Sequence, residues 1–165
     1  MEELLAYRRQ LVDRMEKSVE KFCAAVRAAA GAAPSGEGWN VHQLAVHTRD
    51  GDKLVYGLRV YRTAQEPNPL FEDFDQDAWM AAQYDANEPL EHVLEDLSGS
   101  VHKLAAWLRE APAEAWSRES RHAVMGSGFT MQTWAERGLA HLEGHLEEIE
   151  RAGAESKKEK AKRKK

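Results

Sequence analysis

Two histidines near the C-terminal end of the chain, His141 and His145, have a spacing that could place them in one metal site. Residues four apart in an α-helix project from the same face, one turn above the other. An apolar stripe beside them predicts a core-facing helix over residues 130–151. The stripe consists of Trp134, Leu139, Leu142, Leu146 and Ile149. Two imidazoles at the edge of such a stripe form either a packed polar pair or part of a metal site.

A third histidine, His47, occupies a position in the apolar stripe of another predicted helix that leucine would normally fill. This helix is expected to open at Trp39-Asn40, with Asn40 as its N-cap. Its stripe runs through Leu44, His47, Gly51, Leu54, Leu58 and Tyr61. Burial of an imidazole costs free energy unless a hydrogen bond or a metal compensates. His42 projects about 140° away on the same helix and is expected to face solvent.

Three neutral imidazoles can fill three positions around a divalent transition metal and leave others for water or substrate. Asp50 and Glu148 each follow a candidate ligand by three residues. They are either acceptors for the ligand rings, extra ligands, or ordinary exposed acids. Gly51 and Gly138 either leave room for a bound molecule above a metal or permit close helix packing. Trp39 and Trp134 are candidates for the cavity wall or for ordinary core.

The fold class predicted from length and periodicity is an all-α domain. The chain has 165 residues, of which 42% are hydrophobic and 31% charged, enough for one domain with a substantial core. No segment alternates cleanly between apolar and polar residues, so strands are not expected. Four amphipathic helices, over residues 2–30, 40–61, 89–110 and 130–151, predict a four-helix bundle. The long connection over residues 65–88, with a short helix at 77–84, lets the second and third helices run parallel.

Charge is distributed unevenly along the chain. The net charge is −5, but residues 151–165 carry eight Lys/Arg and two Glu, a balance of +6, which leaves −11 for residues 1–150. The acidic body argues against nucleic acid as a partner except through the basic tail. The tail, residues 153–165, is expected to be disordered. The N-terminus does not resemble a signal peptide, no membrane span is indicated, and Cys23 is the single cysteine. A cytoplasmic protein is therefore expected.

Two segments resemble the DinB superfamily (DinB/YfiT-like proteins). Residues 39–50, WNVHQLAVHTRD, are similar to its second helix, and Gly128-Phe129-Thr130 with Trp134 and residues 139–145, LAHLEGH, are similar to its fourth. The resemblance extends over residues 1–152 and implies a four-helix bundle of up-down-down-up order. It also implies a zinc, nickel or iron ion held at the positions of His47, His141 and His145. Some members transfer groups to or from low-molecular-weight thiols such as bacillithiol or mycothiol, and others are known only as metal-binding or stress-induced proteins.

Three functional interpretations follow. The first is a metal-dependent enzyme, either a thiol S-transferase or a hydrolase, acting on a small molecule, with no general base assigned. The second is a bundle that binds a metal or a small molecule without turnover. The third is a hydrogen-bonded histidine cluster without metal. The aromatic residues of the connections would either pack back on the bundle or form a homodimer interface.

Overall fold

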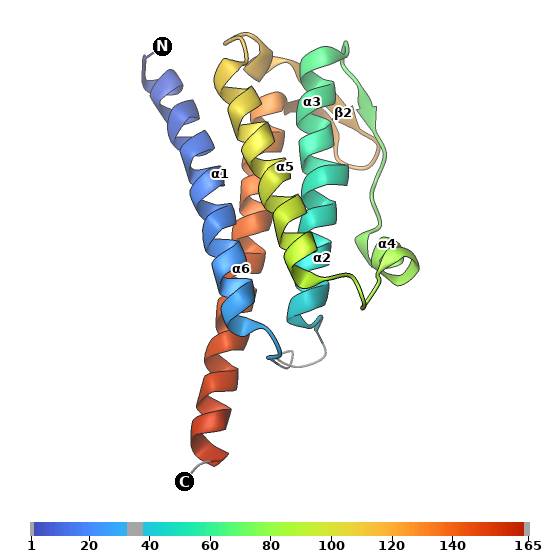
Figure 1. Ribbon diagram of the computed structural model, residues 1–165. Helices are drawn as coiled ribbons and strands as arrows, with labels where there is room; N and C mark the ends of the chain where they lie inside the picture. The colour runs from blue at the N-terminus through green and yellow to red at the C-terminus, as the bar shows by residue number, and fades with distance from the viewer. Residues whose placement is uncertain (1, 33–37, 164–165) are drawn as a thin grey trace.

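The computed structural model describes residues 2–32 and 38–163, and long helices dominate it (Figure 1). Helix α1 spans Glu2–Ala29, α5 spans Leu90–Glu110 and α6 spans Met131–Arg163. Between α1 and α5 a continuous helical rod is formed by α2 (Val41–Gly51), the π-helical segment η1 (Asp52–Gly57) and α3 (Leu58–Gln65). These four rods make the bundle. None of the described helices is long and apolar enough to cross a membrane.

Side-chain pairs define the relative directions of the four rods. Arg14 of α1 pairs with Glu143 of α6, and Gly153 of α6 packs near Ala29, so α1 and α6 run in the same direction. In the second pair of rods, Lys53 pairs with Asp96 of α5, and further along both helices Tyr61 packs on Trp107. The α2–α3 rod and α5 therefore also run in the same direction. The two pairs run in opposite senses, as Figure 1 shows.

The start of the rod has Asn40 as its N-cap, as predicted, and the structure adds a capping box with Gln43. The Asn40 side chain accepts a hydrogen bond from the backbone N–H of Gln43, and the Gln43 side chain accepts one from the backbone N–H of Asn40. Two of the orphan N–H groups at the helix N-terminus are satisfied in this way. This cap sets the phase of α2 and therefore the direction in which His47 projects.

The π-helical turn shifts the buried face of the rod by about one residue. A π turn accommodates an extra residue relative to an α-helical turn. The buried positions run through His47 and Gly51 to Val55 and Val60. The predicted continuation of the stripe through Leu54 and Leu58 is therefore wrong, and these two leucines are 39% and 44% exposed.

The long connection after α3 crosses back along the bundle and contains β1 (Leu70–Phe71) and α4 (Gln76–Gln83). Between α5 and α6 lie a 3-10 turn, η2 (Ala115–Ser117), and strands β2 (Glu119–His122) and β3 (Gly126–Thr130). The three strands form one sheet in the order β1-β2-β3, with β1 parallel and β3 antiparallel to β2. The prediction of an all-α fold without strands is thus corrected: these strands have two to five residues and are rich in polar residues and glycine, which leaves no alternating pattern.

Helix α6 continues eleven residues or so beyond the predicted end of the domain. It includes residues 153–163 of the segment 153–165, so the prediction of a disordered tail is wrong for them. Residues 164–165 lie outside the described part of the chain. The segment AESKKEKAKR is built from strong helix formers, and Glu159 lies four residues before Arg163, a spacing that supports a helix. Helix propensity therefore extends α6 although this end has almost no apolar surface to bury.

Candidate metal centre

His47, His141 and His145 come together where α2 and α6 cross. The Nε2 atom of His141 lies 3.2 Å from Nε2 of His47 and 3.2 Å from Nε2 of His145. One ring nitrogen from each histidine lies within 4.8 Å of the others, so the three form a compact triad. His47 is 4% exposed. His47 and His141 are 94 positions apart in the chain, so the fold brings the triad together.

The contacts within the triad cannot all be good hydrogen bonds between neutral rings. A ring nitrogen of neutral imidazole either carries one proton or offers one lone pair. Nε2 of His141 has two nitrogen neighbours at 3.2 Å, but its single proton or single lone pair can form a well-aligned hydrogen bond with only one of them. A shared cation removes the conflict because three lone pairs can point at it. Two nitrogens each bound to zinc at about 2.0–2.1 Å stand roughly 3.4 Å apart in a tetrahedral site, which is close to the observed spacing.

Burial keeps two of the three rings, those of His47 and His141, in the form that binds metal. Desolvation lowers the pKa of His47 to about 4, with the positive charge of His145 acting in the same direction and Asp50 against it. Desolvation also lowers the pKa of His141 to about 3, helped by His145 and His47. Both rings are therefore neutral at pH 7, and protons do not compete with a metal for their lone pairs. The donor set fits a divalent transition metal.

Glycine and aromatic residues fix the ring positions. A Cβ atom placed on Gly51 would lie 2.7 Å from Cε1 of His141, so the missing side chain makes space for the ligand ring itself. A Cβ on Gly138 would lie 3.0 Å from Cβ of Tyr56. Of the two readings of these glycines, the structure therefore favours close packing. The ring centroids of Trp39 and His47 are 4.5 Å apart, and those of Tyr56 and His141 are 5.0 Å apart.

The two candidate acids have different surroundings. Oε2 of Glu148 lies 3.3 Å from Nδ1 of His145, where it can accept a hydrogen bond from Nδ1–H and leave Nε2 free for a metal. Asp50 instead accepts hydrogen bonds from Nε of Arg49, at 2.8 Å, and from Nε1 of Trp79, at 2.9 Å. It is neither a ligand in this arrangement nor an exposed acid. It ties α4 to α2 next to His47.

Arg49 extends this network by pairing with Glu88, two residues before α5 begins. His42, predicted to face solvent, is half-buried and lies 2.9 Å from the Tyr84 hydroxyl and 2.8 Å from the backbone carbonyl oxygen of Glu88. The solvent prediction was wrong because the crossover connection covers this side of α2. The crossover and the helix that carries His47 are thereby held together.

Trp134 does not wall the triad. It is fully buried, donates a hydrogen bond from Nε1 to Oγ of Ser120 and stacks against Phe129. Tyr56 is the aromatic neighbour that sequence reasoning missed. It falls in η1, and the α-helical phase of the preceding stripe does not place it toward α6.

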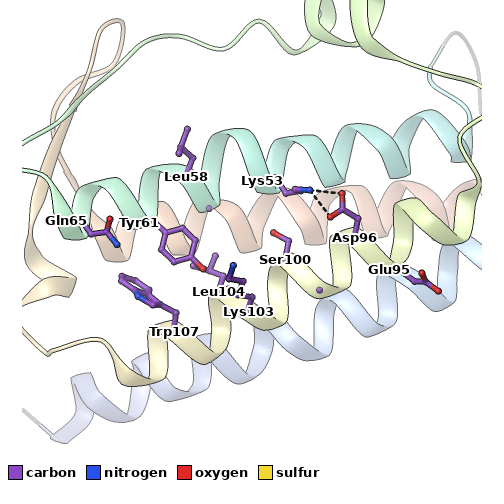
Figure 2. A pocket seen from close by; sticks show the side chains of 12 residues that line it. Lys53, Leu58, Tyr61, Gln65, Glu95, Asp96, Ser100, Lys103, Leu104 and Trp107 are labelled. Atoms are coloured by element: carbon purple, nitrogen blue, oxygen red, sulfur yellow. Dashed lines mark hydrogen bonds and ion pairs between the residues drawn. The ribbon is translucent and has the colours of Figure 1, made fainter.

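Two hollows of the described surface differ in where they lie relative to the triad. A small one of about 210 Å³ lies beside it and is lined by Trp39, Glu148 and Arg151, among others. A larger groove of about 760 Å³ lies elsewhere, between α5 and the rod formed by η1 and α3. Figure 2 shows Tyr61 and Trp107 toward one end of this groove and the Lys53–Asp96 pair toward the other.

The profile of the DinB superfamily matches residues 26–149, a range that contains all three histidines. The chain belongs to the DinB superfamily. Among solved structures, it is similar to YfiT from Bacillus subtilis, described as a probable metal-dependent hydrolase with an unusual four-helix bundle topology. The two share 19% sequence identity and a TM-score of 0.74, over 87% of this chain and 86% of YfiT. No curated protein sequence matches the chain. The similarity confirms the family and the helical-bundle fold.

Proposed function

We propose that this DinB-superfamily protein binds one divalent transition metal through His47, His141 and His145 and uses it to hydrolyse a small molecule. The observation that carries the proposal is the meeting of three Nε2 atoms, two of them 3.2 Å from the third. Neutral, buried imidazoles are the ligands that zinc, nickel and iron favour in such sites. The description of YfiT as a probable metal-dependent hydrolase supports the same reaction class.

Each residue has a distinct part in this proposal. His47, His141 and His145 hold the ion, Glu148 orients the ring of His145, and Gly51 admits the ring of His141. The ion supplies Lewis-acid polarisation and lowers the pKa of water. Three protein ligands leave coordination positions open for substrate, as in catalytic rather than structural zinc sites. Thiol S-transfer stays a prediction from the family resemblance.

Metal analysis tests the proposal. Protein purified without a histidine tag or added metal is analysed beside the His47→Ala and His102→Ala variants. His102 is a partly exposed histidine whose nearest acid is Glu16, at 3.6 Å, and it serves as the control. We expect near-stoichiometric metal in the parent and in the control, and its loss in His47→Ala. Absence of metal in the parent, with no binding after zinc, nickel or iron is added, would reject the proposal.

Activity then separates the reaction classes. The metal-loaded parent and His141→Ala are assayed with small esters and amides, and separately with electrophiles and a low-molecular-weight thiol. Hydrolysis that requires His141 supports the proposal, whereas turnover only in the presence of thiol supports S-transfer. Full metal occupancy without either reaction would support the alternative of a metal-binding bundle without turnover.

We also infer an up-down-down-up order for the bundle from the directions of its four rods. A cytoplasmic location, a small-molecule partner and a homodimer belong to the same proposal. Contact with nucleic acid, if made, is assigned to the basic end of α6, which carries Lys157, Lys158, Lys160, Lys162 and Arg163.

A further inference from the structure

Two arginines on either side of Trp134, Arg59 of α3 and Arg137 of α6, lack an acidic partner within contact distance. Among the residues that the structure describes, no carboxylate oxygen lies within 4.0 Å of either guanidinium group, although five other arginines have such partners. Arg59 is only 7% exposed. A buried cation is costly unless it is paired, so Arg59 is an exception that needs an explanation.

The two guanidinium groups make few protein contacts, and no nitrogen of Arg59 is both fully buried and unbonded, so the remaining N–H donors are accessible from solvent. Arg59 donates a hydrogen bond from Nη2 to the backbone carbonyl oxygen of Glu72, at 3.0 Å. Its guanidinium carbon, Cζ, lies 4.7 Å from the centre of the Trp134 ring. Arg137 contacts Sδ of Met125, at 3.5 Å, and lies 5.9 Å from the centre of the same Trp134 ring. Both cations are thus gathered around one indole. A planar guanidinium with free donors is suited to a carboxylate or phosphate group.

His122 adds a neutral donor to this group. The backbone N–H groups of Val124 and Met125 point at its Nδ1, at 3.2 and 3.3 Å, so the ring proton resides on Nε2. Burial, reinforced by the charge of Arg59, lowers the pKa of His122. The nearest acid is Asp73, 72% exposed, with Oδ1 3.9 Å from Nε2. The Asp73 carboxylate lies more than 4.0 Å from both guanidinium groups, so it forms an ion pair with neither arginine.

Tyr56 connects the arginines to the metal triad. Its ring packs on His141, and the charges of Arg137 and Arg59 both act on its hydroxyl group. Arg137 lies four residues before His141 on α6, and Arg59 lies three residues after Tyr56. A helix rise of about 6 Å therefore separates Arg137 from His141, the nearest ligand along α6. A small molecule could therefore contact the two arginines and the metal triad at the same time.

We propose that Arg59 and Arg137, with His122, form an oxyanion-binding subsite beside the triad. The subsite holds a carboxylate or phosphate group of the substrate while the reacting end of the molecule lies at the metal centre. This inference rests on the proposed function for the substrate's second contact, but the binding of the anion itself does not require metal. The substrate class is a small organic acid or phosphate ester.

Calorimetric titration with inorganic phosphate and, separately, with acetate tests the subsite. Metal-free and zinc-loaded forms of the full chain are compared as parent, Arg137→Gln and Arg9→Gln. Arg9 is an exposed arginine of α1 that also lacks a carboxylate within 4.0 Å among the described residues, which makes it a matched control. We expect the parent to bind at least one anion in both forms, about tenfold more weakly in Arg137→Gln, and unchanged in Arg9→Gln. Arg59→Lys, which keeps the charge, should also weaken binding, because lysine lacks the planar fork.

The outcomes separate this inference from the metal proposal. Tighter binding of phosphate than of acetate would assign the subsite to phosphate esters, and the reverse order would assign it to organic acids. Anion binding that depends on Arg137 in a protein that fails to bind zinc would support the subsite and reject the metal function. Binding of neither anion, an equal loss in Arg9→Gln, or binding that needs zinc and ignores Arg137 would overturn the subsite.

Discussion

At the scale of single residues, Gly51 is the most demanding position of the metal centre. Alanine is the better helix former by about 1 kcal/mol, so propensity alone favours Gly51→Ala. Its Cβ would, however, lie 2.7 Å from Cε1 of His141 and force that ring to move. We expect zinc affinity, measured by competition with a chromogenic chelator, to fall about tenfold or more, the range seen when ligand orientation is disturbed.

Gly99 of α5 is the matched control for this substitution. A Cβ on Gly99 meets nothing within 4 Å, so Gly99→Ala should leave zinc affinity unchanged. It should raise the free energy of unfolding by about 0.5–1 kcal/mol, because alanine loses less chain entropy in a helix. Equal zinc affinities for Gly51→Ala and the parent would show that His141 is not a ligand in its present orientation.

Glu148 contributes to the centre through His145 rather than through the metal. Its carboxylate faces Nδ1 at 3.3 Å, and a charged acceptor there makes the other ring nitrogen a stronger ligand. Glu148→Gln keeps the size of the side chain but removes this charge. We expect zinc to bind about tenfold more weakly by the same competition titration. Glu147→Gln, at the neighbouring exposed position, should not change the affinity, and a parallel loss there would point to a general charge effect.

At the scale of elements, the π-helical segment carries a half-buried acid. Asp52 opens η1 and accepts a hydrogen bond from Oγ of Ser100 on α5, at 2.8 Å. Burial raises the pKa of Asp52 from 3.8 to about 6, against the effects of Ser100 and Lys53. Because the pKa is higher in the folded state, the contribution of Asp52 to stability is fully present below pH 3.8 and is lost as pH rises through 6.

Asp52→Asn should therefore stabilise the protein at neutral pH. The amide oxygen can still accept from Ser100, and no charge remains to be desolvated. We expect the free energy of unfolding in urea at pH 7.5 to rise by up to about 3 kcal/mol, with the difference shrinking toward zero near pH 4. Asp77→Asn, on the exposed side of α4, is the control and should change little. A difference that is independent of pH would contradict the role given to burial.

The long helices could be predicted because each keeps an apolar stripe for several turns, and His47 stood out because it interrupts such a stripe. The sheet could not be predicted, since β1 has two residues and β3 is mostly polar and glycine. Nor could η1, because one extra residue in a helical turn leaves no compositional mark while changing which side chains face α6. That single shift turns Tyr56 toward α6 and leaves Leu54 and Leu58 exposed.

At the scale of the whole molecule, the triad joins the two oppositely directed halves of the bundle. His47 lies on the α2–α3 rod and the paired histidines on α6, so a shared ion would cross-link segments 94 residues apart. A ligand that binds only the folded state stabilises it by an amount set by its concentration relative to its dissociation constant. Metal binding and global stability are therefore coupled.

Removal of metal should lower the melting temperature of the whole domain. At a free zinc concentration one hundred times the dissociation constant, the gain is about 2.7 kcal/mol. For a domain of this size, 1 kcal/mol corresponds to roughly 2–4 °C, so we expect EDTA to lower the melting temperature measured by calorimetry by about 5–10 °C. His102→Ala should respond like the parent, whereas His141→Ala should melt at the same temperature with and without EDTA. If the parent were equally insensitive, the three histidines would be a hydrogen-bonded cluster that holds α2 against α6 without metal, and the low pKa values of His47 and His141 would reflect burial and neighbouring charge.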